Sequence, residues 1–252
     1  MGVKTSAEIE LMRTGGRQLA EVLQVLAKMV EPGLSTKKIA ERAATEMKSR
    51  DLQAILQGFQ GYSDVMCVSL NDEVVHGIPS TKRTIKEGDL VKLDVTAAYK
   101  GLIVDTATTV YVGELDKAPK DVQRLLKGAK QAMEAGIDAI NGEGTRTGDI
   151  AEAIQKVLEA HDLGIVRDLV GHGVGHGVHE EPNVPNYGLK GTGASLPAGA
   201  TIAVEPMATL GGWQVNILND GWTVVTRDHS LSAHFEHTIL VTERGAEILT
   251  SL

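Results

Sequence analysis

The sequence predicts an α+β fold built from two related halves, in which helices cover the outer face of a mainly antiparallel sheet. One offset of 111 residues relates the first half to the second, and it pairs Asp94 with Glu205. Each half has the same layout: a long amphipathic helix, a glycine turn, a shorter helix and then strands. No low-complexity linker separates the halves. We therefore expect residues 1–252 to form one domain with pseudo-repeats of about 1–112 and 113–252.

The identities at this offset fall at equivalent points of the two layouts, which favours a duplication over chance. A pseudo-twofold axis between the halves would bring equivalent positions together at the centre of the molecule. The offset pairs Gly33 with Gly144, Ile39-Ala40-Glu41 with Ile150-Ala151-Glu152, Asp51-Leu52 with Asp162-Leu163, Gly88 with Gly199, and Gly101 with Gly212.

The first long helix has a clear beginning and end in the sequence. Thr5 and Glu8 have the spacing of a capping box, in which each side chain bonds the backbone N–H of the other residue. Apolar residues then recur at helical spacing from Leu19 to Val30. Pro32-Gly33 cannot continue a helix, so we expect the helix to end before it.

The remaining helices follow the same pattern. In the second half, apolar residues at helical spacing run from Val122 to Ile140, and Gly142 follows them. The shorter helices carry apolar stripes over residues 39–47 and 150–158. We interpret all of these stripes as ordinary core packing.

The strands come last in each half, and the clearest pair is a hairpin. Residues 90–97 and 102–112 flank Ala98-Tyr99-Lys100-Gly101, which has the composition of a tight turn. A turn centred between Tyr99 and Lys100 would place Asp94 directly opposite Asp105, with Cβ atoms about 4.5–5.5 Å apart. In the second half, residues 201–208 and 238–242 are the expected counterparts.

Four acidic residues and a histidine, three of them in these strands, predict a metal site. Asp94 and Glu205 each lie in an apolar run, where an unpaired carboxylate costs several kcal/mol or stays protonated. Two divalent cations would neutralise four carboxylates, which indicates a two-metal hydrolase. Oxygen-rich ligands with one nitrogen suit Mn, Fe, Co or Zn. The candidate ligands are Asp94, Asp105, His172, Glu205 and Glu236, with Thr96 and Thr106 beside them to orient the carboxylate oxygens.

The histidine ligand lies in a glycine-rich segment, Gly171 to His179, which contains four glycines and three histidines. The glycines allow sharp turns and close approach of the backbone to a site. In an extended chain His172 and His176 would share a face, and His179 would point the other way. The spacing alone therefore leaves the choice of ligand open.

Composition excludes several classes of protein. The net charge of −8 and the pI near 5.5 argue against nucleic acid as a direct partner. The one cysteine excludes an intrachain disulfide and fits a reducing cytoplasm. No apolar run is long enough to span a membrane, and residues 1–6 show no signal-peptide core. We expect a cytoplasmic protein without a membrane partner.

Together these segments carry a resemblance to a known family. The chain resembles the type I methionine aminopeptidases of peptidase family M24 along nearly its whole length. The matching segments are Val75-His76-Gly77-Ile78-Pro79, Leu93-Asp94-Val95-Thr96, Gly101 to Thr106, Gly171-His172-Gly173-Val174-Gly175, His179-Glu180-Glu181-Pro182, Glu205-Pro206-Met207, Asp220-Gly221-Trp222-Thr223 and Glu236-His237-Thr238.

The resemblance implies a fold and a set of catalytic residues. The fold is the pseudosymmetric "pita-bread" fold, and the five candidate ligands bind two ions, with Asp105 and Glu236 bridging them. His76 and His179 are catalytic histidines that also contact the substrate, and Glu205 takes the proton of the attacking water. His176 falls where the family does not require histidine.

The resemblance also implies a substrate. The enzyme would be a metallo-exopeptidase that removes the N-terminal methionine of nascent polypeptides and prefers a small second residue. Separately, we expect a monomer, and the ribosome is a candidate place of action. The walls of the methionine slot are Phe59, Tyr62, Cys67 and Trp222. Val178 stands where the family commonly has an aromatic residue, so the slot is expected to be wider here.

Two rival functions share this fold. A proline-specific aminopeptidase or dipeptidase carries a large additional N-terminal domain, for which 252 residues leave no room. A fold relative without metals that binds ribosomes or nucleic acid would have broken ligands and added basic segments. This chain keeps all five ligand types, is acidic, and lacks lysine and arginine over residues 209–216.

Overall fold

The computed structural model describes residues 2–252. The four helices expected from the sequence are present, and Thr5 caps the first of them through the capping box with Glu8. None of the helices in residues 2–252 combines the length and apolar character needed to cross a membrane. The helices are α1 (Ser6–Met29), α2 (Thr36–Ser49), α3 (Lys120–Asp138) and α4 (Thr147–Ala160), with short 3-10 helices η1 (Phe59–Gly61) and η2 (Leu115–Lys117).

A nine-stranded sheet contains strands of both halves, and its pairings are antiparallel throughout the described residues. Its main path runs β1 (Gln53–Ala54), β4 (Leu90–Tyr99), β5 (Leu102–Tyr111), β14 (Glu236–Val241), β9 (Thr201–Val204), β7 (Gly171–Gly173) and β8 (Glu180–Val184), while β2 (Cys67–Leu70) also pairs with β4 and β15 (Ala246–Ile248) with β14. There are also two three-stranded sheets. The first has the order β13 (Ser232–His234), β10 (Met207–Thr209) and β6 (Gly164–Ile165). The second has the order β11 (Val215–Ile217), β12 (Val224–Thr226) and β3 (Glu73–Val75).

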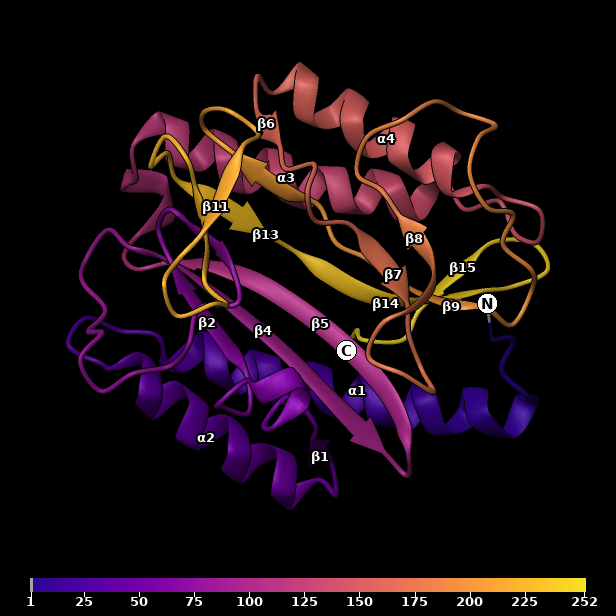
Figure 1. The fold of residues 1–252 in the computed structure, drawn as a ribbon, viewed down its shortest axis with the longest axis horizontal. Coiled ribbons are helices and arrows are strands. Elements are labelled where there is room, and N and C mark those ends of the chain that lie inside the picture. Colours follow the sequence, from indigo (N-terminus) through magenta and orange to yellow (C-terminus); the bar gives the residue numbers. More distant parts are fainter. Residues whose placement is uncertain (1) are drawn as a thin grey trace.

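The order of the central strands shows the expected pseudosymmetry. The order β4-β5-β14-β9 is symmetric about the β5–β14 boundary, because β4 and β9 carry the residues paired by the sequence offset. In Figure 1 the indigo pair α1 and α2 lies below β4 and β5, and the pair α3 and α4 lies above β13 and β14. Each helix pair packs into its own apolar cluster, and each cluster comes mostly from one half. The arrangement is that of the pita-bread fold.

Alternation along β4 separates the core from the site. Val91, Leu93 and Val95 are buried with the apolar face of α1 in one core cluster. Successive side chains of a strand point to opposite faces, so Lys92, Asp94 and Thr96 face away from the helices. Helix α1 comes close to the hairpin at Gly15, where a Cβ atom would lie 2.7 Å from the Cβ of Tyr99. The sheet therefore presents an apolar face to the helices and a polar face to the site.

The register of the β4–β5 hairpin corrects one expectation. Asp105 lies opposite Thr96, and Asp94 lies opposite Ala107, so the two aspartates are diagonal neighbours. The turn is one residue further along than expected, with Lys100 (φ 48°) and Gly101 (φ 86°) as its central residues. Two consecutive positive φ values match a type I′ turn, whose twist fits the flanking strands.

The expected strand over residues 201–208 is also corrected, because it is broken at Glu205-Pro206. Strand β9 ends at Val204 in the large sheet, and β10 begins at Met207 in a three-stranded sheet. Proline has no N–H to donate to a ladder, which is consistent with the interruption there. The break leaves Glu205 between the two sheets.

Candidate active site

One cavity of about 320 Å³ collects every site residue expected from the sequence. It opens on the polar face of the large sheet, opposite the helices. The expected residues that line it are Phe59, Tyr62, Cys67, His76, Asp94, Asp105, His172, His179, Glu205, Trp222 and Glu236. The position of these side chains in one cavity does not by itself assign a role to any of them.

The sheet register explains why the carboxylates meet. Asp94 and Glu236 both lie opposite Ala107, from the two strands that flank β5. Residues directly opposite one another in an antiparallel sheet share a face, so these side chains project to the same side. Asp105 is two residues before Ala107 and therefore projects to that side as well. The β9–β14 register, continued by one residue beyond Val204 opposite His237, aligns Glu205 with Glu236.

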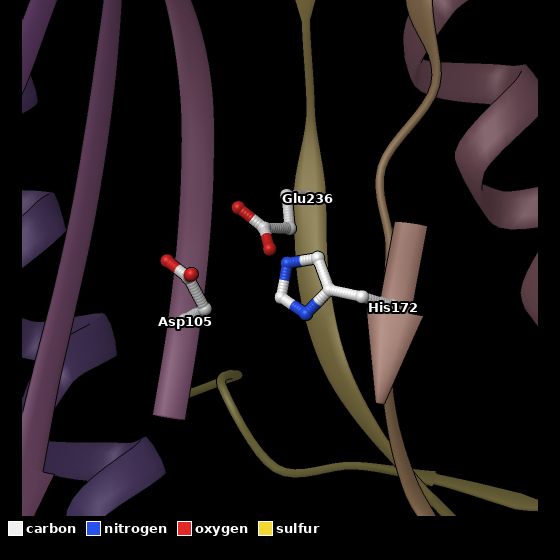
Figure 2. A group of neighbouring side chains, drawn as sticks. All are labelled: Asp105, His172 and Glu236. Atoms are coloured by element: carbon white, nitrogen blue, oxygen red, sulfur yellow. The ribbon is translucent and has the colours of Figure 1, made fainter. Parts of the chain in front are cut away.

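Three of the expected ligands are close enough to hold one cation. One ligand atom each from Asp105, His172 and Glu236 lies within 4.8 Å of the other two, and all three residues are buried. Figure 2 shows these side chains pointing toward one another from β5, β7 and β14. Thr96 Oγ1 donates to Asp105 Oδ1 at 2.9 Å, as expected for an orienting residue. Thr106 differs from the expectation, because its hydroxyl bonds the backbone oxygen of Glu236.

The four carboxyl groups of the acidic cluster, Asp94, Asp105, Glu205 and Glu236, resist ionisation when no metal ion is bound. Burial raises the pKa of Asp94 to about 6 and that of Glu205 to about 7. Burial, and then the neighbouring carboxylates, hold the pKa values of Asp105 and Glu236 well above their usual range. Four carboxylates that share a cavity with no lysine or arginine in its lining lack a balancing cation. A divalent metal ion would supply that charge.

His172 is arranged as a nitrogen ligand. Its Nδ1 lies 2.9 Å from the carbonyl oxygen of Gly173 and donates a hydrogen bond to it. That bond places the proton on Nδ1 and leaves the Nε2 lone pair free, as in metal-binding histidines. Nε2 lies 3.3 Å from Glu205 Oε1, so the two atoms are close enough to bind the same cation. Burial lowers the pKa of His172, which keeps the ring neutral.

The glycine-rich segment brings His179 back to the site, because it is not extended between the histidines. Gly175 has a φ of 140° and its N–H bonds the Gly177 carbonyl, so the chain turns sharply. The rings of His172 and His179 meet edge to face with centroids 4.5 Å apart. His176 is exposed, and its Nε2 lies 2.7 Å from Glu8 Oε1 on α1. The fold thus shows which of the three histidines reach the cavity, which their spacing in the sequence could not.

Aromatic rings form one end of the cavity. Tyr62 and Trp222 meet edge to face at 5.1 Å, and His76 lies against Trp222 with centroids 6.2 Å apart. Phe59 meets the His179 ring at 6.0 Å. The Tyr62 hydroxyl donates inward to backbone carbonyls, which leaves the faces of the ring to an apolar group. Buried Cys67 completes this end, and burial raises the pKa of its thiol.

His76 has a strained backbone. Its φ is 60°, in the left-handed region that residues with a Cβ rarely adopt. Strain of this kind is common at active sites. Burial lowers the pKa of His76 to about 4, so the ring is neutral at pH 7. Burial also lowers the pKa of His179, and the His76 ring adds a smaller effect.

Comparisons with known proteins agree with this geometry. Residues 10–243 match the model of metallopeptidase family M24. The methionine aminopeptidase of Clostridium acetobutylicum is 39% identical over 249 residues, which cover 98% of each chain. The crystal structure of methionine aminopeptidase from Thermotoga maritima superposes with a TM-score of 0.96 at 42% identity, covering 100% of both chains. The chain belongs to the methionine aminopeptidases of metallopeptidase family M24. It is therefore a metallo-aminopeptidase, a hydrolase.

Other proteins with this fold are less similar to this chain in sequence. Prolidase from Pyrococcus furiosus is 21% identical, with a TM-score of 0.78, and the match covers 99% of this chain and 65% of the prolidase. At this identity the likeness shows the pita-bread fold alone. The acidic cluster and the neutral His172 nitrogen fit the divalent metal that the family name implies.

The cavity is also lined by two residues that the sequence did not lead us to expect there. His234 and Met207 line it, directly opposite each other on β13 and β10. His234 is 2% exposed, and its Nε2 lies 3.4 Å from Glu205 Oε2. One signal was available, because His234 is two residues before Glu236. The sequence could not show that β13 returns to the acidic cluster.

Proposed function

We propose that this protein removes the N-terminal methionine of polypeptides with two divalent metal ions held by five side chains. The observation that carries the proposal is the convergence of Asp105, His172 and Glu236 within 4.8 Å, beside an end walled by aromatic rings. Such a cavity joins a hydrolytic centre to a closed apolar slot. That combination suits cleavage next to one long, unbranched apolar side chain.

The five ligands divide by their position. Asp94 would hold one ion, His172 and Glu205 the other, and Asp105 and Glu236 would bind both. The central strands β5 and β14 carry the two shared carboxylates, and the outer ligands come from strands or loops on either side. When bound, a pair of divalent ions supplies Lewis-acid activation of a water and of a carbonyl group.

Three residues would take part in the cleavage, two on the substrate and one on the attacking water. Neutral His179 can donate one N–H to the oxygen of the scissile carbonyl, where negative charge develops. Glu205 would accept the proton of the attacking water and pass it on. His76, beside Trp222, would contact the peptide nitrogen and help the new amine to leave.

The walls of the cavity set the specificity. Phe59, Tyr62, Cys67 and Trp222 would surround the methionine side chain. We infer that the second residue must be small, such as glycine, alanine or serine, and that the natural substrates are the N-termini of nascent polypeptides. The net charge of −8 supports polypeptide, and not nucleic acid, as the partner.

A substrate panel tests this function. The peptides Met-Ala-Ser, Leu-Ala-Ser and Ala-Pro would be assayed with Mn, Fe, Co and Zn in turn, before and after treatment with a chelator. We expect Met-Ala-Ser to have the highest kcat/KM, and activity to disappear with chelator and return with metal. Full turnover in a verified metal-free preparation would contradict the metal assignment. A preference for Ala-Pro would contradict the substrate.

A further inference from the structure

The unexplained group in the cavity is the His234 side chain. It is 2% exposed, and neither of its ring nitrogens has a hydrogen-bond partner among residues 2–252. Buried polar side chains are nearly always hydrogen-bonded, so an orphaned imidazole needs a reason. The nearest acidic oxygen to Nε2 is Oε2 of Glu205, at 3.4 Å. A small rotation of either side chain closes this distance to a hydrogen bond.

The backbone of His234 is fixed from two sides. Thr109 on β5 bonds both its N–H and its carbonyl, with distances of 2.9 and 2.7 Å. Two residues earlier, the buried Lys92 ammonium donates to the Ser232 carbonyl at 3.0 Å. These bonds attach β13 to the β4–β5 hairpin, so the ring approaches Glu205 from a rigid strand.

The position of Glu205 explains why such a partner matters. Glu205 lies at the break between β9 and β10 and is not held within a strand. Its carboxylate lies between two imidazoles, with Oε1 3.3 Å from His172 Nε2 and Oε2 3.4 Å from His234 Nε2. His234 sits opposite Met207, two residues past Glu205, which makes it a diagonal neighbour of Glu205 on the same side.

We propose that His234 is a positioning residue that holds the Glu205 carboxylate. Its Nε2–H donates to Oε2, which leaves Oε1 turned toward His172 and the metal site. The inference rests on the proposed function, in which Glu205 binds metal and accepts a proton. Residues that orient a metal ligand in this way typically contribute 10–100-fold to metal affinity or activity.

The first test is direct and needs neither metal nor substrate. In metal-free protein with ¹⁵N-labelled histidine, held at a pH of about 9 so that the Glu205 carboxyl is ionised, NMR would report which nitrogen of His234 carries the proton, assigned by the loss of its signals in His234→Gln. We expect the proton on Nε2. A proton on Nδ1 would overturn the proposal, because Nε2 could then not donate to Glu205.

The second test compares two replacements of similar size. His234→Gln keeps an N–H donor, and His234→Leu removes it; His229→Leu, at an exposed histidine, is the control for loss of an imidazole. In Mn²⁺ titration calorimetry of His234→Leu, one of the two ions, the one that Glu205 would hold, should bind about 10–100-fold less tightly than in wild type. In His234→Gln its affinity should stay within about threefold of wild type. At saturating metal, kcat should fall by a similar factor in His234→Leu, with KM within about threefold.

A Glu205→Gln background separates the outcomes. If His234 acts through Glu205, His234→Leu adds no further loss of Mn²⁺ affinity to Glu205→Gln. A full additional loss there would overturn the proposal, as would equal losses in His234→Leu and His234→Gln. A wild-type protein that binds Mn²⁺ and shows the Nε2–H tautomer but does not cleave methionyl peptides would refute the proposed function and leave this inference standing.

Discussion

At the scale of single residues, the site depends on which atom of each histidine is free. The Gly173 carbonyl fixes the proton of His172 on Nδ1, so Nε2 can bind a metal. Within the described part of the chain we find no such bond for His179, which is exposed and lines the cavity, so we expect its ring to meet the substrate. The two histidines are adjacent, with ring centroids 4.5 Å apart, and yet they are suited to different tasks.

Replacing these two histidines should therefore give different losses. His179→Ala should lower kcat by about 10²–10³ while both ions stay bound, because it removes a donor to the developing oxyanion. His172→Ala should instead reduce the metal content, which elemental analysis of the purified variants would measure. The reverse pattern would show that the roles of the two histidines are exchanged.

Val178 is the residue where we expect the slot to depart from the family. It lines the cavity next to His179 and packs in a small apolar cluster with Phe59. An aromatic residue at this position would press on the bound side chain, and the smaller valine leaves that space open. We therefore expect the wild-type enzyme to turn over leucine peptides measurably. One methylene in an apolar pocket contributes about 1–3 kcal/mol of discrimination, so methionine should remain preferred.

Val178→Phe should raise the ratio of methionine to leucine turnover, mainly by lowering kcat/KM for leucine. Val178→Ile is the matched control, since it adds one methylene without a ring. Comparing kcat/KM for Met-Ala-Ser and Leu-Ala-Ser in the three proteins checks this. An unchanged ratio in Val178→Phe would place Val178 outside the slot.

At the scale of elements, the β4–β5 hairpin sets the geometry of the acidic cluster. Its two-residue turn fixes which residues of β4 and β5 lie opposite each other, and a slip of one residue would turn Asp94 or Asp105 toward the helices. The same alternation that buries Val91, Leu93 and Val95 against α1 presents Asp94 to the cavity. Core packing and site geometry are therefore consequences of one register.

The two turn residues should respond in opposite directions to substitution. Gly101 has a φ of 86°, and a Cβ atom there would meet nothing within 4 Å, so Gly101→Ala should cost about 1–2 kcal/mol of stability through backbone strain alone. Lys100→Gly should be neutral or stabilising, because Lys100 already has a positive φ of 48°. Urea unfolding of metal-loaded protein would measure both changes. Equal destabilisation by the two would contradict the turn type.

At the scale of the whole molecule, the halves meet at the site. Two apolar clusters, each mostly from one half, lie behind the shared sheet, and the central strands β5 and β14 both supply carboxylates. We propose that residues 1–252 act as one domain, because separating the halves would divide both the sheet and the ligand set. A single cooperative unfolding transition of the metal-loaded protein would support this, and two separate transitions would contradict it.

The acidic cluster should make the metal-free protein sensitive to pH. In an unfolded chain carboxyl groups lose their protons near pH 4, whereas burial raises the pKa values of Asp94 and Glu205 in the folded protein to about 6 and 7. Between these limits the folded state binds more protons than the unfolded state, so stability falls as pH rises from about 4 to about 7.

In chelator, Tm should therefore decrease across this pH range, and Mn²⁺ should raise Tm most at the upper end, where the carboxylates are free to bind it. Differential scanning calorimetry with and without metal would measure the two profiles. The double variant Asp94→Asn, Glu205→Gln is the control, and its metal-free Tm should depend less on pH. A metal-free Tm that rises toward pH 7 in the wild type would contradict the assignment.

Local rules in the sequence determined much of this protein. Helical periodicity and the Thr5 capping box predicted the helices, and the 111-residue offset predicted the pseudosymmetry. The segments around Asp94, Asp105, His172, Glu205 and Glu236 carried the resemblance that named the candidate ligands. These signals are readable because they depend on residues close together in the chain, or on a repeat of the whole pattern.

Only the tertiary structure decided the contacts between distant segments. The hairpin register is an exception: its pairing differs from the expectation by two residues for a local reason, because Gly101 adopts the positive φ of the turn without strain. The return of His179 depends on the turn at Gly175, and the approach of His234 to Glu205 depends on the pairing of β13 with β10. A side chain's partner across a sheet is set by the pairing of whole strands, which residue spacing along the chain does not contain.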